Sequence, residues 1–256
     1  MTNERVSFSF GGCAWLMAYH MGVGRELQAR FDTSSFTFLG ASSGSLAATL
    51  MASGAGMDGG LELACELARE TRTKRFLSPV GRMTSYVRRG MSQYLPADAH
   101  RRVEGRLIIS VTSLPRLRNW RLPDRPLANN DELVNLLLGS CYIPVYYERP
   151  VFVRGRPVVD GGLTDNFPRL DEETVVVSPY PRQSTVAHIF PKIQPRFRHA
   201  VFPDAGVMAR LYDQGRSDCD DFIARTGFAL TTQAARSLPT AGDASTARSL
   251  GMQIVT

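Results

Sequence analysis

The sequence predicts an α/β fold built around a central, mostly parallel sheet. A strand-like run, a Gly-rich loop and a helical run open the chain over residues 6–31. A second strand-like run then leads through a sharp turn into a second helical run over residues 36–52. Alternation of strands and helices is typical of parallel sheets whose connecting helices pack on the sheet. We therefore expect a three-layer α/β/α sandwich.

The bulk composition is that of an ordinary globular protein with excess positive charge. The chain has 256 residues, of which 43% are hydrophobic and 21% charged, and its formal net charge is +6. We expect a single domain over residues 1–256, with a core from about 6 to 230 and a frayed C-terminal tail. A basic balance suits nucleic acid or an anionic membrane surface, and the absence of any nucleic-acid motif favours the membrane surface.

The spacing of the cysteines and the hydropathy of the chain predict the cellular compartment of the protein. The four cysteines are widely spaced and form no C-x-x-C pattern, which predicts free thiols in a reducing compartment. The polar N-terminus lacks the design of a signal peptide, and no apolar run reaches the roughly 18 residues that a membrane span needs. We expect a cytoplasmic protein that is peripheral to membranes or lipid droplets.

The chain begins with an alternating strand over residues 6–10, then the loop Gly11-Gly12-Cys13-Ala14, then a helix over residues 15–31. A Gly-rich loop between strand and helix can cradle phosphate. Neither G-x-G-x-x-G nor a Walker pattern is met here, which disfavours a nucleotide. The alternative is that adjacent parallel strands place the N–H groups of this loop beside the end of the next strand, where they could hold an oxyanion.

The next strand ends in Gly40-Ala41-Ser42-Ser43-Gly44, a G-x-S-x-G segment between a strand over 36–39 and a helix over 45–52. Strand, sharp turn and helix form the context of a nucleophile elbow. Larger side chains at Gly40 and Gly44 would collide with the strand or the helix. The helix N-terminus would supply free N–H groups beside the Ser42 hydroxyl. An ordinary turn made of small residues fits the same pattern.

A glycine-rich break over residues 54–60 precedes an amphipathic helix predicted over 61–76. Ser78-Pro79 is expected to begin another short helix. Arginine and lysine side chains form a basic patch over residues 72–89. This patch is either a solvated helix face or a contact for anionic lipid.

For the second half of the chain, the sequence predicts a series of strands, turns and helices. The expected elements are a strand at 106–113, a polar turn region at 115–126, a helix from Asn129 or Asn130 to Leu138, a hairpin of 151–153 with 157–159, a strand at 174–178, an irregular basic stretch at 191–202 and a helix at 204–226.

The hairpin runs directly into Asp160-Gly161-Gly162. This aspartate is either an ordinary turn residue or a carboxylate at a strand end. In the second case Gly161 and Gly162 would let the backbone and a ligand approach each other closely.

A nucleophilic serine needs a proton acceptor. None of the four histidines lies in a motif that marks a catalytic base, and an isolated histidine is more often structural; they are His20, His100, His188 and His199. Asp160 is the best candidate, which makes a Ser42–Asp160 dyad. Both residues follow predicted strands, and the carboxyl ends of parallel strands gather at one edge of a sheet.

Several segments together resemble the patatin-like phospholipase family, and most of all its adipose triglyceride lipase and adiponutrin branch. The resemblance covers roughly residues 6–230. The segments that carry it are 8–13 (FSFGGC), 19–22 (YHMG), 40–44 (GASSG), 140–146 (SCYIPVY), 160–168 (DGGLTDNFP) and 176–180 (VVSPY).

The resemblance implies roles for the residues of these segments. It implies that Ser42 is the nucleophile, Asp160 its base, and the loop of Gly12, Cys13 and Ala14 the oxyanion hole. The chemistry needs no metal and no cofactor. The family's loop is usually G-x-G-x-x-G, and here Ala14 and Met17 replace its second and third glycines. The alanine matters for the N–H donors only where the backbone φ is positive.

The resemblance also implies a lipid substrate, an acylglycerol or a phospholipid, met at a membrane or lipid-droplet surface. A protein coactivator is a possible partner, and nucleic acid is not expected. The expected activity is hydrolysis of acyl esters. Two alternatives stay open: a transacylase that uses an acylglycerol or lysophospholipid as acceptor, and a lipid-binding protein without catalytic activity.

Overall fold

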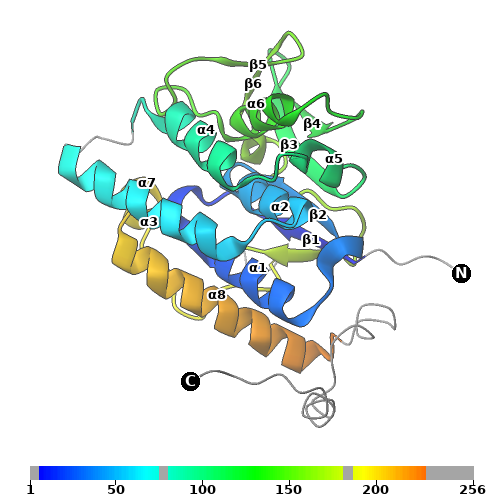
Figure 1. The fold of residues 1–256 in the computed structure, drawn as a ribbon, viewed down its shortest axis with the longest axis vertical. Coiled ribbons are helices and arrows are strands. Elements are labelled where there is room, and N and C mark those ends of the chain that lie inside the picture. Colours follow the sequence, from blue (N-terminus) through cyan, green and yellow to red (C-terminus); the bar gives the residue numbers. More distant parts are fainter. Residues whose placement is uncertain (1–5, 75–79, 181–186, 229–256) are drawn as a thin grey trace, which may run out of the picture.

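The computed structural model describes residues 6–74, 80–180 and 187–228. Its centre is a 7-stranded sheet with the order β5-β6-β3-β2-β1-β7, in which β4 pairs with the other side of β3 (Figure 1). The strands are β1 (Ser7–Phe10), β2 (Thr37–Ala41), β3 (Leu107–Ser113), β4 (Arg118–Leu122), β5 (Val151–Val153), β6 (Arg156–Val159) and β7 (Val175–Val177).

The middle of this sheet is parallel and its far edge is antiparallel. β1 pairs in parallel with β2 and β7, and β2 pairs in parallel with β3. β4 and β6 both run antiparallel to β3, and β5 and β6 form a hairpin. The predicted α/β fold with a central, mostly parallel sheet is confirmed.

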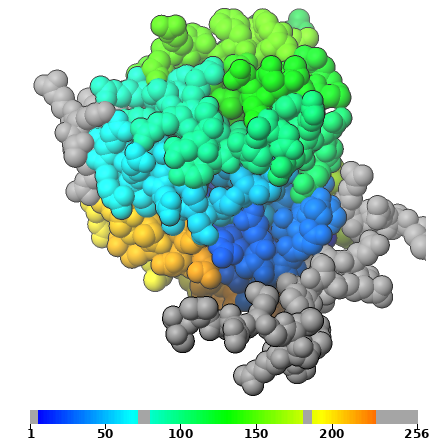
Figure 2. Space-filling model, in the orientation of Figure 1, coloured from blue at the N-terminus to red at the C-terminus, as the bar shows by residue number. Residues whose placement is uncertain are grey.

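The helices follow and flank these strands. Figure 2 shows the face of the molecule on which α3 and α4 lie together above α8. The helices are α1 (Ala18–Arg30), α2 (Ser43–Ser53), α3 (Met57–Lys74), α4 (Met83–Tyr94), α5 (Ala99–Arg102), α6 (Asn130–Cys141), α7 (Arg198–Val201) and α8 (Ala205–Thr226), with short 3-10 turns η1 (Ala14–Met17), η2 (Thr33–Ser35) and η3 (Gly161–Leu163).

The core is centred on β1, β2 and α2. Every residue of these two strands and of α2 is buried. Strands covered on both faces need no polar side, which explains the nearly continuous apolar run Phe36 to Leu39. The turn between β2 and α2 therefore starts from the best-packed part of the molecule.

Three expected boundaries are wrong for local reasons. α3 begins at Met57 and includes Gly59, where the sequence predicts a break. A Cβ at Gly59 would overlap the ring of Tyr94 on α4, so this glycine serves close helix packing and does not end a helix. The first helix is split into η1 and α1, and α6 continues to Cys141, beyond the predicted end at Leu138.

The predicted turn region at 115–126 contains strand β4, which pairs with β3 from Ile109 to Ser113. The irregular stretch at 191–202 contains the short helix α7. Ser78-Pro79, where a helix was expected to begin, and the tail beyond residue 228 lie outside the described residues.

The basic patch over 72–89 divides into different environments. Arg89 forms salt bridges with Glu66 and Glu70 of α3, while Arg82 and Arg88 are exposed. Exposed salt bridges of this kind contribute roughly 0–1 kcal/mol, so Arg89 is an ordinary surface residue. Within the described ranges, no helix combines the length and the apolar character needed to cross a bilayer.

Candidate active site

Ser42 occupies the sharp turn between β2 and α2 with a strained backbone. Its φ of 53° and ψ of −135° lie in a region that residues with a side chain rarely adopt. The Ser42 N–H donates to Ser140 Oγ at 2.9 Å, and Ser140 Oγ donates to the Ser110 carbonyl at 2.7 Å. This chain of hydrogen bonds from α6 to β3 holds the strained turn in place, which is how such conformations persist at functional sites.

The two glycines of the turn are required by close backbone contacts. A Cβ at Gly44 would overlap the carbonyl of Phe10 at the end of β1, and a Cβ at Gly40 would lie 2.5 Å from the Gly44 carbonyl oxygen. The turn therefore packs directly on the end of β1. This packing brings Ser42 next to the loop that follows β1.

Asp160 reaches the same place along an antiparallel strand. Ala41, the last residue of β2, pairs with Ser110 of β3, and β3 then continues past the end of β2. β6 pairs with this overhang through Thr112 and runs back towards the end of β2. The expectation that Asp160 lies at the carboxyl edge of a parallel strand is therefore wrong, although the antiparallel return still brings the residue to the Ser42 turn.

The Asp160 carboxyl group is held by the turn that follows it. Its Oδ1 atom accepts a hydrogen bond from the Gly162 N–H at 2.8 Å. Its Oδ2 atom is buried and forms no hydrogen bond of ordinary geometry within the described residues, although the Ser42 hydroxyl lies near enough to lower the pKa of the carboxyl group. A Cβ at Gly161 would overlap the Ser110 carbonyl, so only glycine lets η3 pack this closely on β3.

Burial raises the pKa of Asp160 to about 6, while the Ser42 hydroxyl and the Gly162 N–H both lower it. The side chain of Ser42 thus favours the ionised form of the Asp160 carboxyl group. A carboxyl group with such a pKa is mostly ionised at neutral pH and is still basic enough to take up a proton. The structure brings together the two residues from which the sequence predicts a dyad.

The loop after β1 is held by side chains from two other segments. The Gly12 N–H donates to Asn166 Oδ1 at 2.9 Å, and the Cys13 N–H donates to Ser43 Oγ at 3.1 Å. The Ala14 N–H has no acceptor among the described residues. Of the three predicted oxyanion donors, two already make internal hydrogen bonds and one is available.

Ala14 adopts the conformation in which the replacement of a glycine has a cost. Its φ is +50°, in the left-handed region. An L-residue with a Cβ is destabilised there by about 1–2 kcal/mol. The loop keeps its shape in spite of this strain because Asn166 and Ser43 hold the two preceding N–H groups.

His20 supports the same loop and is not placed as a base. Its Nε2–H donates to the Gly11 carbonyl at 2.8 Å, and burial lowers its pKa to about 4, which keeps the ring neutral. The remaining histidines have other partners: His100 contacts Asn130, the Nδ1 atom of His188 accepts from the Val176 N–H, and His199 accepts from Arg198. None of these hydrogen bonds involves Ser42.

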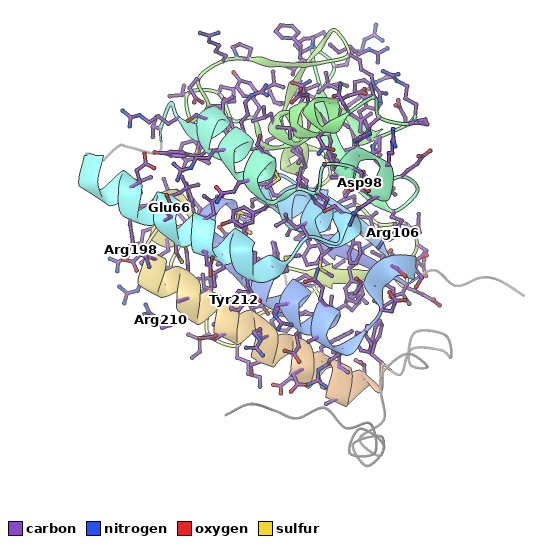
Figure 3. All side chains as sticks on the ribbon, viewed as in Figure 1. Glu66, Asp98, Arg106, Arg198, Arg210 and Tyr212 are labelled. Atoms are coloured by element: carbon purple, nitrogen blue, oxygen red, sulfur yellow. The ribbon has the colours of Figure 1, made fainter. Side chains whose placement is uncertain are left out.

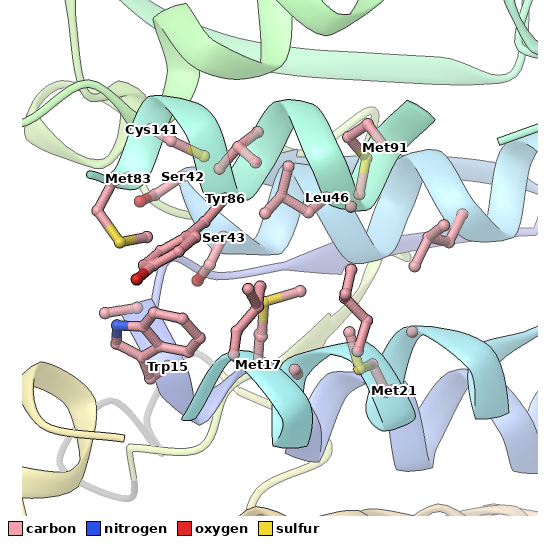
Figure 4. A pocket seen from close by; sticks show the side chains of 18 of the residues that line it. Trp15, Met17, Met21, Ser42, Ser43, Leu46, Met83, Tyr86, Met91 and Cys141 are labelled. Atoms are coloured by element: carbon pink, nitrogen blue, oxygen red, sulfur yellow. The ribbon is translucent and has the colours of Figure 1, made fainter. Parts of the chain in front are cut away.

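An apolar pocket begins at Ser42 and runs between α2, α3 and α4. It holds about 800 Å³ of empty space, including its open mouth. Figure 4 shows Ser42, Trp15 and Tyr86 towards one end and Met21 and Met91 towards the other. Methionine also contributes Met17 and Met83 to the wall. Unbranched thioether side chains adapt to ligands of varied shape, so this wall suits a long flexible chain.

Sequence reasoning missed the residues that hold the site together. Ser140 and Asn166 lie within the segments 140–146 and 160–168, but nothing in their immediate sequence shows that they bond to Ser42 and Gly12. Ser43 follows the nucleophile candidate directly, and its Oγ holds Cys13. The position of His20, in the first turn of α1 soon after the Gly-rich loop, is the local signal that could have indicated a role in supporting that loop.

Comparison with known proteins places the chain in a family. Residues 8–171 match the family model of the patatin-like phospholipases. Human 1-acylglycerol-3-phosphate O-acyltransferase PNPLA3 is 33% identical over 181 residues, and mouse patatin-like phospholipase domain-containing protein 2 is 35% identical over 188 residues. These alignments cover 68% and 70% of this chain but only 37% and 38% of the relatives.

A solved structure supports the same fold at much lower sequence identity. VipD from Legionella pneumophila superposes with a TM-score of 0.52 at 11% identity, over 87% of this chain and 67% of that one. At this identity the likeness concerns the fold alone. The family model and the identity to the mammalian relatives carry the assignment: the chain belongs to the patatin-like phospholipase family.

Proposed function

We propose that the protein is a serine acyl-ester hydrolase that acts on lipids through Ser42 and Asp160. The observation that carries the proposal is the placement of Asp160 beside the Ser42 hydroxyl, at one end of an apolar pocket. A nucleophile, a base and a channel for an acyl chain then meet at one point. Ser42 follows β2, Asp160 follows β6, and the pocket lies between the helices α2, α3 and α4.

In the proposed mechanism Asp160 accepts the proton of the Ser42 hydroxyl as Ser42 Oγ attacks the ester carbonyl carbon. The Ala14 N–H and the N-terminus of α2 stabilise the oxyanion of the tetrahedral intermediate. The intermediate collapses to an acyl-enzyme, and the leaving alcohol receives the proton from Asp160. Water, deprotonated by Asp160, then attacks the acyl carbon, the bond to Ser42 Oγ breaks and releases the fatty acid, and Ser42 Oγ takes the proton back from Asp160.

The pocket indicates the class of substrate. Its lining is almost entirely apolar beyond Ser42 and Ser43, which suits an acyl chain and not a polar headgroup. An acylglycerol or a phospholipid presents its ester at the junction of an apolar chain and a polar group. Such a substrate is met at a membrane or lipid-droplet surface, and a protein coactivator remains a prediction.

Transacylation is the second candidate function. The relatives PNPLA3 and Pnpla3 are named 1-acylglycerol-3-phosphate O-acyltransferases. The acyl-enzyme is common to both reactions, and the acceptor, water or an acylglycerol or lysophospholipid, decides the product. The third reading, a lipid-binding protein without activity, predicts occupancy of the pocket and no turnover.

The test begins with hydrolysis of a short-chain nitrophenyl ester by the wild type, Ser42→Ala and Ser35→Ala. Ser35 is an exposed serine of η2 and serves as the matched control. We expect Ser42→Ala to abolish turnover and Ser35→Ala to retain it. A panel of acylglycerols and phospholipids, with and without a labelled lysophospholipid acceptor, then separates hydrolysis from transacylation. Equal turnover by Ser42→Ala and the wild type would refute the proposal.

A further inference from the structure

Three segments meet where the apolar pocket begins. Tyr146 Oη accepts a hydrogen bond from Trp15 Nε1 at 2.9 Å and donates one to the Val201 carbonyl at 3.3 Å. Trp15 and Tyr146 both line the pocket. The Gly81 N–H donates to the Tyr146 carbonyl, which adds the start of α4 to the same place. The rim of the pocket is therefore built from η1, residues 143–147 and the region of α7.

Large apolar side chains on this rim are exposed. Ile143 is 44% exposed, Val145 82% and Phe197, which directly precedes α7, 72%. Ile143 also lines the pocket, so the exposed apolar surface continues into the channel that leads to Ser42. The pocket and this surface form one apolar path.

Val145, the most exposed of these three side chains, lies on a strained backbone. Its φ is +74°, in the left-handed region. For a β-branched residue this conformation is a genuine outlier. The turn, in which the Tyr146 and Tyr147 N–H groups both donate to the Ile143 carbonyl, thus presents a large apolar side chain to solvent on a strained backbone. Strain of this kind points to a function for the exposed side chain.

Arg196 and Arg198 flank Phe197 in the sequence, and Arg82 lies at the start of α4. Arg82, Arg196 and Arg198 are exposed, and within the described ranges none of them forms a salt bridge. Figure 3 shows Arg198 and Arg210 at the same end of the molecule. Burial lowers the pKa of His199, and the charges of Arg198, Arg196 and Arg210 lower it further against the single opposing charge of Asp204. Around His199 the arginines therefore outnumber the carboxylates.

We propose that this rim surface, made of Ile143, Val145 and Phe197 with Arg82, Arg196 and Arg198, docks the protein on the surface of an anionic phospholipid bilayer. The inference deepens the proposed function and rests on it, since it identifies the face through which the lipid ester would enter. Charge complementarity selects the occupant: exposed arginines bind phosphate groups, and apolar side chains between them enter the acyl region.

Docking through this face solves the problem of substrate transfer. A fatty acyl chain that crosses water exposes its whole apolar surface, at a cost of about 25 cal/mol per Å². With the rim seated on the bilayer, the acyl chain passes along Ile143 into the pocket without leaving an apolar environment. The ester group then arrives at Ser42 last.

The test measures binding to vesicles of phosphatidylcholine with and without phosphatidylglycerol by flotation, using the full chain. Phe197→Asp is compared with Phe152→Asp, which places the same charge at a phenylalanine of edge strand β5 that is 55% exposed. We expect Phe197→Asp to lower binding to the anionic vesicles at least about tenfold and Phe152→Asp to leave it unchanged. Val145→Asp is the second rim variant, because aspartate tolerates the left-handed conformation.

The arginines are tested by the double variant Arg196→Gln/Arg198→Gln. We expect its binding to anionic vesicles to fall about fivefold for each charge removed, and its binding to neutral vesicles to stay the same. Equal loss of binding in the rim variants and in Phe152→Asp, or wild-type binding by both Phe197→Asp and Val145→Asp, would overturn the docking surface. Vesicle binding by a wild type that hydrolyses no ester would instead overturn the proposed function and leave the docking surface in place.

Discussion

The residues around Ser42 and the residues that line the pocket beyond it are held in different ways. Around Ser42 the positions are fixed by hydrogen bonds between distant segments, such as Ser140 to Ser42 and Asn166 to Gly12. The pocket wall has side chains such as Met21, which only pack against apolar neighbours. The positions around Ser42 therefore depend on the directions of hydrogen bonds, whereas the pocket wall depends only on how apolar side chains fill space.

This difference matches the two demands of the proposed reaction. Bond making and proton transfer need atoms held in a fixed geometry, and a misplacement of about 1 Å costs up to about 10²-fold in rate. An acyl chain needs a space of suitable length with adaptable walls. Changes in the polar part should therefore affect the rate for every substrate, whereas changes in the pocket should affect the choice among substrates.

The largest expected effect is that of Asp160→Asn. The amide keeps the shape and the hydrogen bond from Gly162 but removes the base, so turnover of a soluble ester should fall at least about 10²-fold. The matched control is Asp165→Asn in the same segment, where the carboxylate forms a salt bridge with Arg121. Because partly exposed pairs contribute little, this control should retain its activity. Loss of activity in both variants alike would remove the special role of Asp160.

Asn166→Ala tests the hydrogen bonds around the loop. Without Asn166 Oδ1 the Gly12 N–H loses its acceptor, and the loop that carries the Ala14 N–H is no longer held. We expect kcat to fall by about tenfold, with less effect on KM. Asn135→Ala, which removes an exposed bond to the Phe152 carbonyl, is the control and should have no effect.

A rise in kcat for Asn166→Ala would contradict this account of the loop. It would mean that Asn166 competes with the oxyanion for the Gly12 N–H, and that Gly12 is itself a donor in the transition state.

Gly60→Leu tests the pocket. A Cβ at Gly60 would lie 3.1 Å from Met21 Cε and 3.3 Å from Leu50 Cδ1, so a larger side chain fills the pocket near Met21, away from Ser42. The ratio of long-chain to short-chain ester turnover should fall several-fold. An unchanged ratio, measured over a series of nitrophenyl esters, would show that the acyl chain takes another path.

The smallest expected effect concerns stability at Ala14. Glycine relieves the left-handed strain, worth about 1–2 kcal/mol, but loses about 0.4–1 kcal/mol through the greater freedom of the unfolded chain. Ala14→Gly should therefore raise Tm by a few degrees. Ala209→Gly, at an exposed position of α8, should lower it, because glycine in a helix interior costs about 1 kcal/mol. A lower Tm for both variants would show that Ala14 is not strained.

Much of the fold can be predicted from the sequence because it depends on local patterns. The strand–turn–helix around Ser42 follows from two glycines and two apolar runs. β4 is missed because only Leu122 of its five residues is buried, so Arg118 to Leu122 shows no apolar alternation. The predicted start of α3 is too late because a glycine such as Gly59 can either end a helix or let another helix pack closely. Only the position of Tyr94 on α4 decides between the two.

The sequence predicts the reacting residues of the site but not the residues that hold them in place. Ser42 and Asp160 stand out because glycines follow or flank them at predicted strand ends. The route that brings Asp160 to Ser42 depends on how far β3 extends past β2, which is a property of strand pairing. The bonds from Ser140 and Asn166 likewise join segments that are distant in sequence, so no local pattern reveals them.

The most direct test of the central claim is the rate at which an organophosphonate labels Ser42, followed by mass spectrometry as a function of pH. Asp160 accepts the proton only when ionised, so the wild-type rate should be high above its pKa of about 6 and should fall about tenfold per pH unit below it. Asp160→Asn should be labelled at least about 10²-fold more slowly and without this midpoint. His188→Ala and His199→Ala should be labelled like the wild type, whereas loss of labelling in either folded histidine variant, or an unchanged rate in Asp160→Asn, would contradict the Ser42–Asp160 dyad.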